Sequence, residues 1–144
     1  MNAAALILFA AGCNSDRPDP AMAEVSSLGL QVTVTRVATH PFLARYNLKL
    51  TVETQDGCSV SSDLFPDTGG VSRRNVYVGG SARLYVIGQF DARVFEKSTC
   101  SITLREFRSL EEGMHYVGVF DVEDNRQWSF FPAAVRREQL FERL

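Results

Sequence analysis

From Leu28 onward, apolar and polar residues alternate along most of the chain. The clearest runs, at 30–34 and 46–52, place an apolar side chain at every second position. This period of two predicts strands with one buried face and one face in water, because successive side chains of a strand point to opposite sides. Shorter alternating runs cover residues 100–104, 116–122 and 128–130, and two continuous apolar runs, 76–78 and 84–87, flank a pair of glycines. We therefore predict about seven strands.

Turn residues separate these runs. Asp56 and Gly57 end the second strand, and Gly79 and Gly80 join two runs into a hairpin, in which we expect the glycines to supply the positive φ angles. Strands do not alternate with helices, which disfavours nucleotide-binding α/β folds. The pattern predicts an all-β chain, a single antiparallel β-sandwich of the immunoglobulin or transthyretin type over residues 25–144. The predicted core includes Val32, Leu50, Val86 and Phe120.

The end of the chain has a different period. Ala133, Leu140, Phe141 and Leu144 fall on one face of a helix, with Arg137 among them. We therefore predict a short C-terminal helix, which either packs against the sheet or docks a partner.

The N-terminus carries an apolar run, residues 3–12, that ends at Cys13. Its length is half of what a membrane-spanning helix needs and is typical of a signal peptide. Small residues before a cysteine at the end of such a run resemble the lipobox of bacterial lipoproteins. The resemblance implies that residues 1–12 are a signal peptide and that Cys13 becomes the first residue and carries lipid, such as palmitate. Residues 13–24, which are polar with two prolines, are predicted to be a flexible tether.

The resemblance also implies a location. Lipid chains hold a domain at a membrane without spanning it, and Asn14 in place of Asp favours the outer membrane, with the domain in the periplasm. The sequence departs from the pattern in two ways, since the run has no Lys or Arg before it and Ala10 stands where Leu is commoner. Two alternatives stay open: cleavage after Ala23, which releases a secreted domain, and an uncleaved apolar segment with a buried free cysteine.

The net charge indicates which classes of partner are disfavoured, and the cysteine content indicates whether a disulfide is expected. A net charge of −2 offers no basic field for nucleic acid, so nucleic-acid partners are disfavoured. Once Cys13 is assigned to lipid, Cys58 and Cys100 remain, and an exported domain meets oxidising surroundings. We predict a disulfide between them, which closes a loop of about 43 residues and stabilises the fold by roughly 4 kcal/mol.

No residue pattern predicts a catalytic centre, a metal site or a cofactor. Residues 79–83 lack the second glycine of a serine-hydrolase elbow. His40 and His115 have no paired ligand nearby, and the acidic run 121–125 lacks the glycine and final Glu of a calcium loop. We therefore predict a non-enzymatic protein. A pair of sheet carboxylates for glycoside hydrolysis stays the open alternative.

The connection 61–74 is longer than a typical hairpin loop, and long loops tend to be functional. It holds an apolar pair followed by two glycines and an arginine pair, and aromatic residues and arginine are enriched in binding patches. The alternative is that the apolar pair plugs the open end of the sandwich. With two residues of the C-terminal segment, the predicted partner-binding residues are Leu64, Phe65, Arg73, Arg74, Arg137 and Phe141.

Together these features predict an envelope lipoprotein that binds another protein, as an accessory or assembly factor of a cell-envelope or secretion apparatus. The alternative is a binder of cell-wall polymer or an inhibitor of a periplasmic enzyme such as lysozyme. Ser81 and Tyr85 are similar to the Ser-x-x-x-Tyr segment of membrane-bound lysozyme inhibitors. The Trp-Lys-Gly element of that family is missing, so none of its residue roles is carried over.

Overall fold

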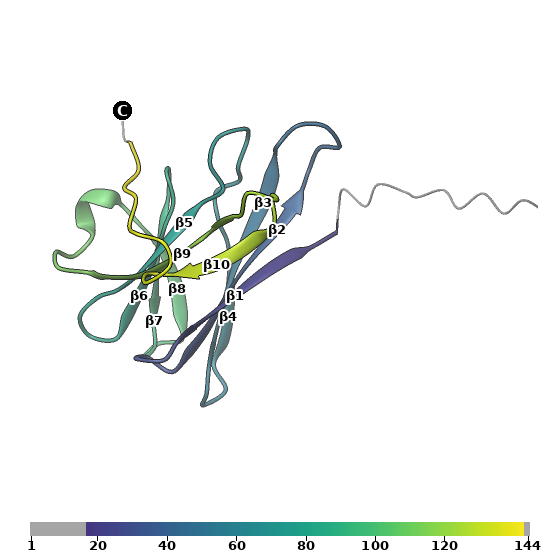
Figure 1. Cartoon of the computed structure of the whole chain (residues 1–144). Helices are drawn as coiled ribbons and strands as arrows, with labels where there is room; N and C mark the ends of the chain where they lie inside the picture. Colours follow the sequence, from purple (N-terminus) through teal and green to yellow (C-terminus); the bar gives the residue numbers. More distant parts are fainter. Residues whose placement is uncertain (1–16, 143–144) are drawn as a thin grey trace, which may run out of the picture.

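The computed structural model describes residues 17–142, which form ten strands in two antiparallel sheets (Figure 1). The four-stranded sheet has the order β1 (Asp19–Val25), β2 (Leu30–Ala38), β3 (Tyr46–Thr54) and β4 (Ser59–Asp63). The six-stranded sheet has the order β10 (Trp128–Pro132), β9 (His115–Val122), β5 (Arg74–Val78), β6 (Arg83–Ile87), β7 (Ala92–Glu96) and β8 (Ser101–Arg105). A single 3-10 turn, Phe107–Ser109, follows β8. The predicted all-β class is confirmed.

One hydrophobic core is shared by the two sheets. Strands β2 and β3 bury every second side chain in it, among them Val32 and Leu50. Val86 of β6 and Phe120 of β9 contribute from the other sheet. All four of these predicted core residues are at most 1% exposed, so the predicted strand phase is confirmed.

The six-stranded sheet is also buried on its other face. A second cluster there consists of Tyr77, Tyr85, Ile87, Ala92 and Val94. It is covered by Phe107, Leu110, Met114, Tyr116 and Phe141. Because both faces are covered, β5 and β6 are buried at nearly every position. This is why residues 76–78 of β5 and 84–87 of β6 are continuous apolar runs rather than alternating ones.

The prediction of about seven strands is too low, because the pattern misses β1, β4 and β7. β1 occupies residues 19–25, so the predicted tether is wrong for this part of the chain. Pro20 is tolerated because β1 is an edge strand, whose outer N–H groups need no partner. β4 is the opposite edge and consists of Ser, Val and Asp, which gives no apolar alternation.

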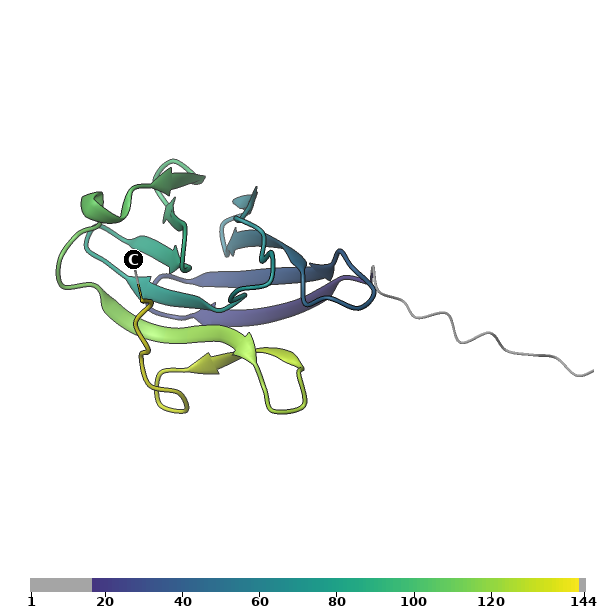
Figure 2. The same ribbon diagram turned by 90° about the horizontal axis from the view of Figure 1, so that it is seen from above.

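The predicted C-terminal helix is absent from residues 133–142, and that prediction is wrong. The chain turns after Pro132 and then runs extended past the six-stranded sheet (Figure 2). Side chains of the strands donate hydrogen bonds to main-chain carbonyls that, in a helix, would accept N–H groups of the same segment. The Tyr116 hydroxyl donates to the Arg136 carbonyl at 3.0 Å, and Asn75 Nδ2 donates to the Gln139 carbonyl at 2.9 Å. We refer to residues 137–142 as the tail.

The β5–β6 hairpin is confirmed, but its turn uses different residues than expected. Ser81 and Ala82, not the glycines, have positive φ angles, of 55° and 56°. Gly79 is needed for space instead. A Cβ on Gly79 would overlap the Glu111 carboxylate and lie 2.6 Å from the Tyr85 ring.

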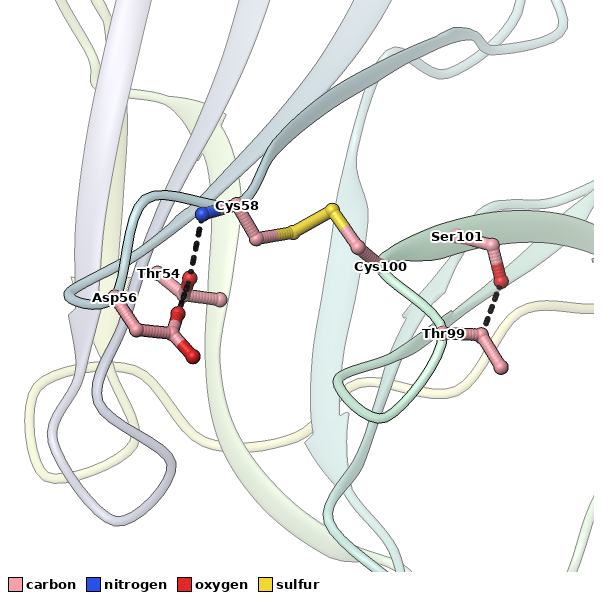
Figure 3. The surroundings of a disulfide bond; sticks show 6 residues. All are labelled: Thr54, Asp56, Cys58, Thr99, Cys100 and Ser101. Carbon is pink, nitrogen blue, oxygen red and sulfur yellow. Dashed lines mark hydrogen bonds between the residues drawn. A yellow bond between two sulfur atoms is a disulfide. The ribbon is translucent and has the colours of Figure 1, made fainter.

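The predicted disulfide between Cys58 and Cys100 is confirmed (Figure 3). Cys58 precedes β4 and Cys100 precedes β8, and their Cα atoms lie 6.0 Å apart. The bond therefore ties the outer strand of one sheet to the outer strand of the other. β1 contacts β10 at the opposite edges, so the two sheets are in contact along both sides of the core.

Candidate functional site

A groove lies on the outer face of the six-stranded sheet, between the tail and the segment that follows β8. We name it the tail groove; its volume is about 470 Å³. Its floor consists of Asn75, Tyr77 and Ile87 from β5 and β6. Its walls are Leu110, Glu111, Gly113 and Met114 on one side and Glu138, Leu140 and Phe141 on the other. The groove is therefore mainly apolar, with a few polar groups, as ligand-binding sites usually are.

The tail is bound to the domain through its main chain and one aromatic ring. Arg73 and Asn75 both donate hydrogen bonds to the Gln139 carbonyl. The Arg73 guanidinium also lies 4.1 Å from the centre of the Phe141 ring, which is a cation–π contact. This part of the surface therefore already holds an extended chain segment by its carbonyl oxygen and an aromatic side chain.

Asn75 has unused hydrogen-bonding capacity at the floor of the groove. The residue is 1% exposed, and its Nδ2 donates to the Tyr77 hydroxyl at 3.2 Å as well as to the tail. Its Oδ1 has no hydrogen-bond partner among the described residues. A buried acceptor without a partner costs about 1–3 kcal/mol. The atom is closed to solvent, so a ligand can bring it an N–H or O–H group only if the neighbouring chain moves aside.

The tyrosines around the groove are neutral at physiological pH. Burial raises the pKa of Tyr77, and the neighbouring Glu138 carboxylate raises it further. Burial likewise raises the pKa of Tyr116, whose ring centre lies 5.7 Å from that of Tyr77. A phenol with a raised pKa donates hydrogen bonds and is a poor nucleophile, since the nucleophilic form is the anion. These groups are suited to binding rather than to proton abstraction.

A buried ion pair organises the loops at one end of the domain. Arg74 Nη2 lies 3.4 Å from Asp91 Oδ1, and both side chains are almost completely buried. Asp91 Oδ2 also accepts the Phe65 N–H at 2.9 Å, which attaches the β4–β5 loop to the β6–β7 turn. Gly88 leaves the space that the guanidinium fills, because a Cβ there would lie 2.7 Å from it. Arg74 therefore holds the loops together.

The structure separates the six predicted partner-binding residues into two groups. Leu64, Arg73 and Arg74 are buried, so the prediction that they form an exposed contact surface is wrong. Leu64 belongs to the shared core, which corresponds to the plug alternative. The residues that keep surface for a partner are Phe65, Arg137 and Phe141, and only Phe141 lines the tail groove.

Other residues considered from the sequence have structural partners. His40 Nδ1 accepts two backbone N–H groups of its own loop, and Asp121 pairs with Arg136 at 2.9 Å. Tyr85 is buried, which leaves the similarity to lysozyme inhibitors without an accessible tyrosine. Within residues 17–142, no group of three or more His, Cys, Asp or Glu side chains is arranged to hold a metal ion.

The sequence pattern misses the floor and one wall of the groove. Asn75 is a polar residue in a strand that the structure buries on both faces. In the sequence, its position directly before the apolar run 76–78 is the one sign of such a residue. The wall formed by Leu110 and Met114 comes from a segment with no regular period. Without such a period, the sequence does not indicate which side of the segment its apolar residues occupy.

Comparison of the chain with protein-family models, with curated proteins and with solved structures finds no match. No helix within residues 17–142 has the length and apolar character needed to cross a membrane. Function has to be inferred from the geometry of the molecule itself.

Proposed function

We propose that this chain is an exported lipoprotein, anchored through lipid on Cys13, whose domain binds another envelope protein and catalyses no reaction. Its place is the outer membrane, with the domain in the periplasm, and its two sheets form a sandwich of the immunoglobulin or transthyretin type. Cys13 itself lies outside the described residues. The observation that carries the binding role is the tail groove, with its apolar walls and the unpaired Asn75 acceptor.

The position of β1 supports processing at Cys13. Cleavage after Ala23, the secreted alternative, would leave only Glu24 and Val25 of this strand. It would remove Ala21 and Ala23 from the core, where both are buried. Cleavage before Cys13 leaves all of β1 in place. The disulfide supports export as well, since such bonds persist in oxidising compartments.

The tail groove favours an extended peptide segment as the partner's contact. The tail shows how this surface accepts a chain, through a carbonyl held by side-chain donors and an aromatic ring under an arginine. The open space beside it suits an apolar side chain between Met114 and Phe141. If the segment displaces the tail, one of its main-chain N–H groups can pair with Asn75 Oδ1, which is otherwise closed to solvent. Peptide recognition commonly combines main-chain hydrogen bonds with pockets for side chains in this way.

Cross-linking of the full-length chain in its native host tests this role. Leu140 lines the groove and is 73% exposed, so Leu140→Asp places a charge at the rim without disturbing the core. Val135→Asp is the matched control, because Val135 is 71% exposed and does not line the groove. We expect Leu140→Asp to reduce the yield of the cross-linked partner roughly tenfold, a loss of about 1.4 kcal/mol. The control should keep the wild-type yield.

Two outcomes would contradict the proposal. Equal yields from both variants would exclude the tail groove as the contact. Cross-links to cell-wall fragments, without a reproducible protein, would favour the polymer-binding alternative.

A further inference from the structure

Exposed aromatic side chains gather on loops at one end of the domain. Phe42, on the β2–β3 loop, is 91% exposed, and Phe90, on the β6–β7 turn, is 70% exposed. Phe65 and Val71, on the β4–β5 loop between them, are partly exposed. Exposed phenylalanines on several loops at one end are unusual for a surface that faces only water. We name these three loops, residues 39–45, 64–73 and 88–91, the aromatic end.

Hydrogen bonds fix the three loops to one another. Tyr46, the first residue of β3 after the first loop, exchanges two backbone hydrogen bonds with Asp67 of the second loop, of 2.8 and 2.9 Å. The second loop is joined to the third by the bond from the Phe65 N–H to Asp91. Arg74, the first residue of β5, bridges the same two loops, because it pairs with Asp91 and donates to the Phe65 carbonyl. The aromatic end is therefore a platform held together by its own polar groups.

The acidic side chains of the aromatic end take part in the bonds within and between its loops. Asp67 and Asp91 are the acidic residues of the three loops, and both are buried. Asp67 accepts bonds from Gly69, Gly70 and Ser72 within its own loop. Arg45 is the exposed charged residue of the platform. No carboxylate within these loops faces outward, but Asp63, the last residue of β4, is exposed directly before the second loop and lies opposite Lys49 on β3.

The N-terminal strand begins at this same end. Asp19 pairs with Arg36, near the end of β2, and the β2–β3 loop follows directly. Both views show the start of β1 beside that loop (Figures 1 and 2). Asp19 is the sixth residue after Cys13, and a fully extended chain covers at most about 3.6 Å per residue, or roughly 20 Å in all.

We propose that the aromatic end rests on the surface of the bilayer that holds the lipid anchor, with Phe42 and Phe90 inserted among the lipid headgroups. This inference rests on the proposed lipidation of Cys13. Given that anchor, the short distance to β1 keeps this end next to the membrane. Phenylalanine is among the side chains with which interfacial segments enter a bilayer to that depth, and anionic lipid attracts arginine. Three exposed carboxylates lie at the same end, Glu123 and Asp124 on the turn after β9 and Asp63 at the end of β4, so the contact requires a tilt that keeps all three in water.

Tryptophan reporters in the full-length, lipidated chain test this contact. The chain is reconstituted into vesicles of phosphatidylethanolamine and phosphatidylglycerol, with or without brominated acyl chains that quench tryptophan fluorescence. Phe42→Trp places the reporter on the aromatic end, and Val135→Trp places it at another largely exposed site, away from these loops. Trp128 is buried in the core and gives the same background in both variants.

We expect brominated lipid to remove roughly half of the added fluorescence of Phe42→Trp, because interfacial side chains lie about 5–10 Å into the headgroup region. The Val135→Trp signal should be unchanged. If the chain floats with the vesicles but neither reporter is quenched, the membrane contact is wrong and the lipid anchor stands. If the chain does not float with the vesicles, the anchor is wrong and this inference falls with it.

Discussion

The disulfide is the strongest single constraint that can be removed from this fold. Replacing Cys58 and Cys100 with serine separates the outer strand of the four-stranded sheet from that of the six-stranded sheet. The two cysteines are 42 positions apart. For a loop of this length, the loop-closure model gives an entropy loss in the unfolded chain of about 13 cal/mol/K. This corresponds to about 4 kcal/mol at 25 °C, or about a thousandfold in the folding equilibrium.

Urea unfolding measures this difference. All proteins carry Cys13→Ser, so that a third thiol cannot exchange with the pair. The oxidised parent is compared with the Cys58→Ser/Cys100→Ser variant, and the reduced parent serves as a control in which both cysteines of the pair are kept. With a denaturant slope of about 2 kcal/mol/M, we expect the midpoint to fall by roughly 2 M urea.

The slope itself is informative in this experiment. An uncrosslinked unfolded chain exposes more surface, so the variant should have the steeper dependence on urea. A loss of less than about 1 kcal/mol would refute the reasoning. It would mean that the unfolded chain stays compact around the loop without the bond, or that the bond strains the folded state.

Three further changes test other parts of the structure. Gly88→Ala places a Cβ against the buried Arg74 guanidinium, so we expect urea unfolding to show a loss of about 1–3 kcal/mol; an unchanged midpoint would show that the guanidinium can move aside. Ser81→Asn with Ala82→Gly suits the positive φ angles of the turn and should stabilise by about 1 kcal/mol in the same assay, whereas a loss would contradict the turn geometry. Burial raises the pKa of Tyr77, so its stabilising contribution is complete below about pH 10 and is lost as the pH rises through the raised value. Unfolding free energies at pH 8 and pH 10.5 should therefore differ more for wild type than for Tyr77→Phe, and equal differences would contradict the burial of this phenol.

Regular alternation predicts those strands that bury one face. β2 and β3 follow the period of two, and their buried positions are those expected from the sequence. Strands that do not contrast an apolar face with a polar face show no alternation and are missed. β4 is a half-exposed edge strand without apolar contrast, and β1 contains two small alanines that are buried because of their neighbours rather than their size.

The tail shows a second reason for failure. Leu140 and Phe141 fall on one face of a hypothetical helix, but helical period alone does not supply the contacts that stabilise a short helix. In this fold, Asn75 donates to the Gln139 carbonyl of the tail, and Tyr116 donates to the Arg136 carbonyl just before it. These donors are 64 and 20 residues away along the chain. Such tertiary competition cannot be seen in the local sequence.

The candidate site was predictable only in part. The sequence singles out Phe141 and the β4–β5 loop, and Phe141 does line the tail groove. Arginine in a loop indicates a binding surface when it is exposed, but Arg73 and Arg74 are buried and bind parts of their own chain. Burial of such residues depends on partners such as Asp91, which are distant in sequence and therefore invisible to a local pattern.

The lipid anchor at Cys13 is the central claim, because both the location and the membrane contact depend on it. The most direct measurement is the mass of the N-terminal peptide of the chain extracted from bacterial membranes. We predict that this peptide begins at Cys13 and carries a diacylglyceryl group on the thiol. A peptide that begins at Glu24, or one that contains Cys13 with a free thiol, would contradict the account.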